Sequence, residues 1–239
     1  MPSSIRDNYS LLKARIADVC GRCGRDPEEI RIIWVSKTQP KEKILEALSA
    51  GAFEFGENKA QEVLEKFPLE DAGKEYRLHF IGRLQSNKVR KIIPACSSIQ
   101  SVDSLDLLER INRICGEMGV TRDIFFQVNT SAESSKTGFS PEGFLDVLDE
   151  MPQYSHLRFK GLMTIGPFTS DLNAVRTAFR DLADLLKRIK RDFSSKNRAL
   201  REMKLLSMGM SDDFEVAIEE GSHYIRIGTS LFGSRRGTL

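Results

Sequence analysis

The chain has 239 residues, of which 40% are hydrophobic and 29% are charged. That length is close to the roughly 250 residues of a typical (β/α)8 barrel and leaves no room for a second full domain. The 36 lysine and arginine residues nearly balance 34 aspartate and glutamate residues, which argues against a general attraction to nucleic acids or anionic membranes. Because no apolar stretch could cross a bilayer and the polar N-terminus is unlike a secretory signal, we expect a cytoplasmic protein.

The four cysteines give little indication of a metal site. Cys20 and Cys23 form a C-x-x-C pair, but Cys96 and Cys115 lie far from it and form no second pair. A zinc site with four thiolates would therefore lack half of its ligands, and the three histidines show no ligand spacing. We expect no metal and reduced, structural cysteines, with a redox role for the C-x-x-C pair as the alternative.

Strand-like and helix-like segments alternate along the whole chain, without a linker or a low-complexity tract. An amphipathic helix is predicted near residues 4 to 22. Eight strands follow, near residues 30–37, 53–58, 78–82, 98–103, 123–129, 159–164, 204–208 and 224–228. The predicted helices between them lie near residues 41–50, 58–67, 86–93, 104–118, 141–150, 171–193 and 212–220, with a last turn after 229. Repeated strand and helix units with short connections require parallel strands. Residues 1–239 are therefore predicted to form one α/β domain, a (β/α)8 TIM barrel with an extra N-terminal helix.

Residues with known preferences stand at several predicted helix ends. Asp103-Ser104 and Ser211-Asp212 can cap helix N-termini, and Pro141 follows Ser140 at a first helical position. Glycines stand where three helices should stop, at Gly51, Gly119 and Gly221.

The longest predicted helix carries a basic run at residues 187–191 on the face opposite its apolar stripe. Nucleic-acid binding is one interpretation of such a run. A solvated surface is the simpler one, because no aromatic side chains for base stacking are interleaved with the basic residues.

Lys37 closes the apolar run of residues 30–36 and so stands at the end of the first predicted strand. In a barrel of this kind the chemistry gathers at the C-terminal ends of the strands. A neutral amine at that place can attack an aldehyde and form a Schiff base. The alternative is a surface lysine whose charge reaches the solvent.

The last two strand ends share a pattern that is typical of phosphate binding. Residues 206–212 and 226–230 both run from a strand through glycine and hydroxyl residues into a helix start. Free backbone N–H groups and the helix dipole attract anions there, and these two loops form the usual phosphate site of the barrel. Alternatively, Ser207, Thr229 and Ser230 only cap helices.

Alternation of side chains along the eighth strand points Tyr224, Arg226 and Gly228 into the barrel if Ile225 and Ile227 face outward. An inward arginine needs an anion. Arg226 either forms a structural ion pair with Glu54 or faces a ligand. An aldehyde-reactive lysine, a phosphate site and an inward arginine together predict a pocket for pyridoxal 5′-phosphate (PLP).

Seven segments in order resemble the YggS/PROSC family of pyridoxal phosphate homeostasis proteins, which share the barrel of the alanine racemase N-terminal domain. The match extends over nearly the whole chain. The segments are residues 35–38 (VSKT), 55–58 (FGEN), 79–88 (HFIGRLQSNK), 135–139 (SKTGF), 161–164 (GLMT), 206–211 (LSMGMS) and 226–233 (RIGTSLFG).

The resemblance implies a fold type III PLP-binding protein in which Lys37 carries the cofactor as an aldimine. It also implies that Asn58 lies beside the ring and that Arg226 approaches the pyridine nitrogen or the phosphate. Ser207, Gly228 and Thr229 would bind the phosphate, and Met208 would belong to the same site. The basic residues that follow Gly82, namely Lys88, Arg90 and Lys91, either guide anions or form a solvated helix face.

The cofactor alone does not decide between an enzyme and a carrier. Racemases and decarboxylases with this barrel carry a further β-domain and dimerise, whereas this chain ends at Leu239, just past the eighth strand. We therefore expect a monomer that buffers PLP, delivers it to apo-enzymes and has no catalytic residue. A permanent charge on Arg226 beside the pyridine nitrogen would weaken the ring as an electron sink. The alternatives are a weak PLP-dependent amino-acid racemase or related enzyme, and a cofactor-free aldolase that uses Lys37 on a sugar phosphate.

Overall fold

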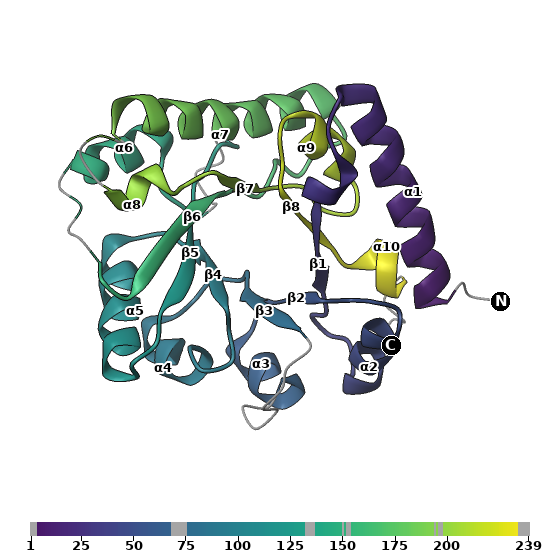
Figure 1. Cartoon of the computed structure of the whole chain (residues 1–239), viewed down its shortest axis with the longest axis horizontal. Coiled ribbons are helices and arrows are strands. Elements are labelled where there is room, and N and C mark those ends of the chain that lie inside the picture. Colours follow the sequence, from purple (N-terminus) through teal and green to yellow (C-terminus); the bar gives the residue numbers. More distant parts are fainter. Residues whose placement is uncertain are drawn as a thin grey trace.

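Eight parallel strands form a closed barrel in which each strand pairs with its neighbours in chain order (Figure 1). The computed structural model describes residues 4–67, 76–131, 137–149, 151, 154–193, 195 and 198–233. The strands are β1 (Arg31–Val35), β2 (Glu54–Glu57), β3 (Arg77–Phe80), β4 (Ser98–Val102), β5 (Arg122–Gln127), β6 (Leu157–Met163), β7 (Leu205–Ser207) and β8 (Tyr224–Ile227). Pairing of β1 with β8 closes the barrel. The predicted fold class and all eight strands are confirmed.

Helices surround the barrel, and the N-terminal helix α1 runs beside α9 and α10 (Figure 1). The longer helices are α1 (Ile5–Cys23), α2 (Lys41–Ser49), α3 (Ala60–Lys66), α5 (Leu105–Glu117), α6 (Pro141–Asp149), α7 (Leu172–Asp192) and α9 (Phe214–Glu219). The shorter ones are η1 (Pro27–Glu29), η2 (Ser86–Lys88), α4 (Val89–Ile92), α8 (Arg198–Arg201) and α10 (Thr229–Phe232). The helix predicted near residues 86 to 93 is a 3-10 turn followed by one α-helical turn. The elements η1 and α8 were not predicted.

Most of the predicted helix ends are confirmed. Ser104 Oγ accepts a hydrogen bond from Leu107 N at the start of α5, and the three glycines predicted as stops have positive φ angles. The prediction for Ser211-Asp212 was wrong: α9 begins at Phe214 after Asp213. Residues 211–213 form a turn instead, and Ser211 lines a cavity while its Oγ accepts a hydrogen bond from Ser230 N at 3.5 Å.

The barrel has two apolar regions, separated by the sheet. Inside it lies a small cluster, and outside it the large core fills the space between strands and helices. The inner cluster consists of Ile33, Val35, Ile81, Phe125, Met163 and Tyr224. The outer core contains Ile225 and Ile227. The alternation predicted for β8 is therefore confirmed.

The C-x-x-C pair lies at the C-terminal end of α1, where Cys20 is buried and Cys23 is half-buried. All four cysteines are free thiols. In the described part of the chain, no three His, Cys, Asp or Glu side chains are grouped to hold a metal ion. None of the helices in that part is long and apolar enough to cross a membrane.

His223, just before β8, makes the stability of the fold depend on pH. Its Nδ1 accepts a hydrogen bond from Leu206 N at 3.2 Å, and burial, aided by nearby Arg25, lowers its pKa. The neutral ring therefore stabilises the fold above the unfolded pKa of about 6.5, and this contribution is lost as pH falls through the folded pKa. We expect urea unfolding to show a steeper loss of stability from about pH 7.5 to about pH 5.5 in the wild type than in His223→Gln. Equal losses in the two proteins would contradict this assignment.

Candidate functional site

Five of the seven residues predicted to bind a cofactor line one cavity of about 370 Å³. These residues are Lys37, Asn58, Arg226, Gly228 and Thr229. They follow or end strands β1, β2 and β8, so the cavity opens at the C-terminal end of the barrel, where barrels of this kind carry their chemistry. Below, it is called the Lys37 cavity.

Lys37 reaches the cavity because of the alternation along β1. Ile33 and Val35 point into the barrel, and Lys37 is two residues further along the chain. The next residue, Thr38, has a φ angle of 64°. This left-handed conformation is unfavourable for a β-branched residue, so the surrounding structure must hold the turn in place.

Lys66 on α3 forms a buried ion cluster directly behind this turn. Its Nζ donates hydrogen bonds to Ser36 O at 2.8 Å, Glu57 Oε1 at 3.0 Å and Glu62 Oε2 at 2.5 Å. The Lys66 side chain is only 9% exposed, and that of Glu57 is fully buried. The ammonium group thus has three oxygen partners, which is the full number that it can satisfy. This cluster is called the Lys66 network.

The Lys66 network holds the backbone on both sides of Lys37. Ser36, whose carbonyl accepts from the ammonium group, precedes Lys37. Thr38, which follows it, donates its backbone N–H to Glu62 Oε2 at 2.7 Å. We infer that the network fixes the direction in which the Lys37 side chain leaves the barrel wall.

The two carboxylates of the network have opposite pKa shifts. Burial raises the pKa of Glu57, against hydrogen bonds from Ser36 and Lys66 that lower it. Burial alone would also raise the pKa of Glu62, but hydrogen bonds from Lys66 Nζ and Thr38 N outweigh it and lower that pKa. The charge on Glu57 therefore depends on the hydroxyl of Ser36 and on the ammonium group of Lys66, which both oppose the effect of burial.

Arg226 is buried, and its guanidinium group is held by oxygen atoms of two neighbouring strand ends. It donates to Ser207 O at 2.8 Å, Ser207 Oγ at 2.9 Å and Thr164 O at 2.7 Å. The alternative prediction of an ion pair with Glu54 was wrong, because the Glu54 carboxylate lies 3.7 Å from Arg31 instead. Among the described residues, no carboxylate is within ion-pair distance of Arg226, although the charge of Asp213 favours its protonated form. Arg226 therefore lines the Lys37 cavity without a direct ion-pair partner.

Ser207 and Met208, predicted to belong to the cofactor site, do not line the Lys37 cavity. Both are fully buried. Besides accepting from Arg226, the Ser207 hydroxyl donates to Gln100 Oε1 at 2.7 Å, and Gln100 Nε2 lies 3.3 Å from His79 Nδ1. A chain of polar side chains thus crosses the barrel interior and orients Arg226. A direct contact of Ser207 or Met208 with a cofactor stays a prediction.

The turn after β7 contributes a hydroxyl that the sequence analysis assigned to a helix cap and not to the cofactor site. Ser211 lines the cavity, together with Met210 and Asp212. The turn depends on Gly209, which has a φ angle of 94° and no room for a Cβ atom, and on Asp213, whose Oδ1 accepts from Met210 N at 2.5 Å. The pattern that could have predicted Ser211 as a cavity residue is its position two residues after Gly209, in a turn that requires glycine.

Gly82, two residues after the end of β3, allows the next loop to pack on Asn58. A Cβ atom at position 82 would lie 2.2 Å from Asn58 O, which is backbone and cannot rotate away. We expect Gly82→Ala to lower the unfolding free energy by about 1–3 kcal/mol in urea titrations, as overpacking does. Gly21→Ala is the control, because nothing lies within 4 Å of a Cβ there. If Gly82→Ala were as stable as this control, the close approach of residue 82 to the Asn58 backbone would be contradicted.

A family model described as "Alanine racemase, N-terminal domain" matches residues 4–236, which assigns the chain to that class of barrel. At the level of sequence, it is 38% identical over 231 residues to a pyridoxal phosphate homeostasis protein of Aquifex aeolicus, covering 96% of this chain and 98% of the relative. A protein of the same name from Pseudomonas aeruginosa is 38% identical over 233 residues, covering 98% of this chain and 96% of the relative. The chain belongs to the family of pyridoxal phosphate homeostasis proteins.

Solved structures agree with that assignment. PipY of Synechococcus elongatus, solved with PLP bound, is 31% identical with a TM-score of 0.82, covering 96% of this chain and all of that chain. A structure described as an unknown protein from Bifidobacterium adolescentis is 34% identical with a TM-score of 0.86, covering 95% of this chain and 94% of that one. A diaminopimelate decarboxylase of M. jannaschii, at 15% identity and a TM-score of 0.70, shares the fold alone; the match covers 95% of this chain but 59% of that one.

Proposed function

We propose that the protein binds pyridoxal 5′-phosphate in the Lys37 cavity and holds it covalently through Lys37 Nζ. The observation that carries this proposal is the common cavity of an amine, a buried guanidinium group and hydroxyl side chains that include those of Ser211 and Thr229. The PLP bound to PipY, a relative 31% identical to this chain, supports it.

The residues present fit this cofactor in charge and in hydrogen bonding. Asn58 Oδ1 is buried and has no hydrogen-bond partner among the described residues, which is costly unless a ligand supplies one. Ser211 and Thr229 can donate to a phosphate group, and the cationic Arg226 favours an anion in the cavity. A volume of about 370 Å³ falls within the usual range for small-molecule sites.

When bound, PLP supplies an aldehyde that reacts with amines and a ring that withdraws electrons. Lys37 would hold the cofactor through its Nζ, which would condense with the aldehyde carbon as one water molecule leaves. Burial lowers the pKa of Arg226 to about 10, which still leaves the guanidinium group charged at neutral pH. If it meets the pyridine nitrogen, this charge disfavours protonation there and weakens the ring as an electron sink.

The proposed role is therefore storage and release of a reactive aldehyde rather than catalytic turnover. Buffering in the cytoplasm by a monomer, with delivery to apo-enzymes, is the form of this role that we propose. The low-identity similarity to decarboxylases and to an alanine racemase concerns the fold alone. The match to the N-terminal domain of alanine racemase makes weak racemisation of a small amino acid the competing activity.

Absorption spectra of the purified protein test the proposal. We expect a visible band after addition of PLP, and borohydride should fix the label on the peptide that contains Lys37. Incubation with a panel of amino acids in heavy water should give no sustained exchange at Cα. Sustained exchange would establish the enzyme, and a colourless protein in excess PLP would contradict binding itself.

A further inference from the structure

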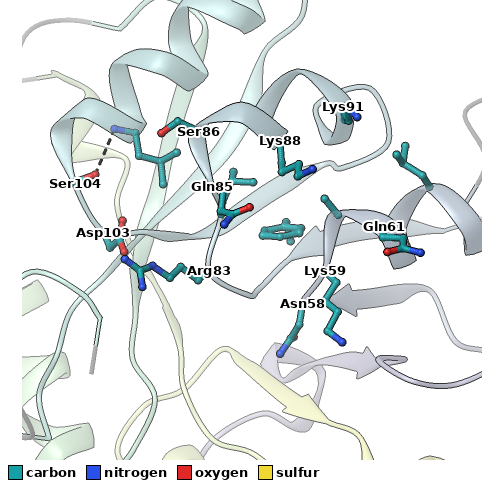
Figure 2. A pocket seen from close by; sticks show the side chains of 15 residues that line it. Asn58, Lys59, Gln61, Arg83, Gln85, Ser86, Lys88, Lys91, Asp103 and Ser104 are labelled. Atoms are coloured by element: carbon teal, nitrogen blue, oxygen red, sulfur yellow. Dashed lines mark hydrogen bonds between the residues drawn. The ribbon is translucent and has the colours of Figure 1, made fainter. Parts of the chain in front are cut away.

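A second cavity, of about 860 Å³, opens at the same end of the barrel. It lies between the loops that follow β2, β3 and β4, and the motif of residues 82–88 forms one wall (Figure 2). Asn58 lines both this cavity and the Lys37 cavity, so the two are neighbours. Below, it is called the Arg83 cavity.

Four cationic side chains line the Arg83 cavity, namely Lys59, Arg83, Lys88 and Lys91, against one carboxylate, that of Asp103. Figure 2 shows Lys88 and Lys91 on one side and Arg83 with Asp103 on the other. No carboxylate among the described residues lies within the 4.0 Å ion-pair distance of any of the four cations. The cavity therefore carries a positive potential that favours an anion.

Many other cations on the described surface are paired with carboxylates, unlike the four that line this cavity. On α7, for example, Arg176 binds Glu219 at 2.5 Å and Glu220 at 2.7 Å, and Arg180 binds Glu220 at 3.1 Å. Such pairs neutralise one another at the surface. Unpaired cations gathered around one cavity are instead the arrangement that recognises phosphate groups.

The inner wall of the Arg83 cavity is apolar. Phe80, Leu84 and Leu107 are buried behind it, and Leu84 anchors the loop between the exposed Arg83 and Gln85. An apolar wall with a few polar groups is typical of small-molecule sites. This wall favours a ring-bearing ligand over an acidic peptide, which needs only surface charge.

We propose that the Arg83 cavity binds a small organic phosphate, such as a nucleotide or a sugar phosphate, beside the Lys37 cavity. Arg83, Lys88 and Lys91 donate to the phosphate, the ligand's ring packs toward Leu84, and Asp103 accepts a hydrogen bond from a ligand hydroxyl or amine. This site goes beyond the proposed function, because none of these five residues lines the Lys37 cavity.

Calorimetric titration of the full chain tests the proposal with three probes: adenosine 5′-monophosphate, glucose 6-phosphate and inorganic phosphate. Each titration is performed with and without one equivalent of PLP. We expect one of the two organic phosphates to bind more tightly than inorganic phosphate. Tighter binding of adenosine 5′-monophosphate would identify the ligand as a nucleotide, and tighter binding of glucose 6-phosphate would identify it as a sugar phosphate. Both outcomes support the site.

The triple variant Arg83→Gln/Lys88→Gln/Lys91→Gln should bind the preferred probe at least about tenfold more weakly, because it loses the charged donors to the phosphate. The matched control removes three cations from α7, as Lys187→Gln/Arg188→Gln/Arg191→Gln, and should bind as the wild type does. If the triple variant fails to fold, Arg83→Gln alone serves, since Arg83 is exposed and has no ion-pair partner among the described residues.

Equal binding by the triple variant and the control would overturn the proposal, as would binding of an oligoglutamate peptide with no binding of the organic phosphates. The triple variant should still develop the visible PLP band. Absence of that band in the wild type refutes the proposed function, while the phosphate titrations still decide on the Arg83 cavity.

Discussion

Lys37→Ala is expected to abolish covalent attachment of PLP and the visible band that accompanies it. No other lysine among the described residues lines the Lys37 cavity, and alanine has no nucleophile to replace the amine. The phosphate-binding groups remain, so the variant should still bind PLP reversibly, at least about tenfold more weakly. Spectra with and without borohydride, followed by mass spectrometry of the reduced protein, measure both effects.

Lys41→Ala is the matched control for that experiment. Lys41 is exposed at the start of α2, four residues from Lys37, and lies outside the cavity. This control should retain the visible band and the borohydride label, because surface lysines react with aldehydes only weakly and nonspecifically. An unchanged spectrum in Lys37→Ala, or an equal loss in the two variants, would refute the assignment of the amine.

Alternation along single strands allowed the sequence to predict the central part of this site. Arg226 was assigned to the cavity because it extends a series of inward-facing residues, and period two is a local property of the backbone. Lys37 was assigned to it because it closes an apolar run at the end of a strand, which is also a local pattern. Glycines with positive φ, such as Gly51, mark helix ends for an equally local reason.

Contacts between distant elements account for what the sequence did not predict. Ser207 lies in a strand-to-helix segment that is typical of phosphate binding. Its hydroxyl nevertheless donates a hydrogen bond to Gln100, which is 107 positions away in the sequence. Ser211 reaches the cavity because Gly209 and Asp213 shape a turn that a regular helix start would not give. The short helix α8 carries no periodic pattern long enough to detect.

The Lys66 network shows the same distinction between local and distant contacts. The spacing of Glu62 and Lys66, four residues apart on a helix, is a recognisable sequence pattern that usually means a weak surface pair. The contact of Lys66 with Glu57, at the end of β2, makes it a buried cluster instead. Burial changes the energetic meaning of the same residues, because charges removed from water need partners.

Lys66→Met is therefore expected to lower the unfolding free energy by about 3–5 kcal/mol at neutral pH, since it leaves a buried carboxylate unpaired. Without the ammonium group, the pKa of Glu57 in the folded state should rise further. A raised folded pKa gives stability that is present below the unfolded pKa and lost as pH rises. Urea unfolding should consequently show a larger loss at about pH 8 than at about pH 5.

The double variant Lys66→Met/Glu57→Gln separates this charge effect from lost packing. A neutral glutamine at position 57 cannot leave a buried charge, so part of the stability and most of the pH dependence should return. The Lys66 network also holds both backbone neighbours of Lys37. Lys66→Met should therefore slow formation of the visible PLP band, although Lys66 is not among the residues that line the cavity. A single variant with normal stability and normal rate would show that the network does not position Lys37.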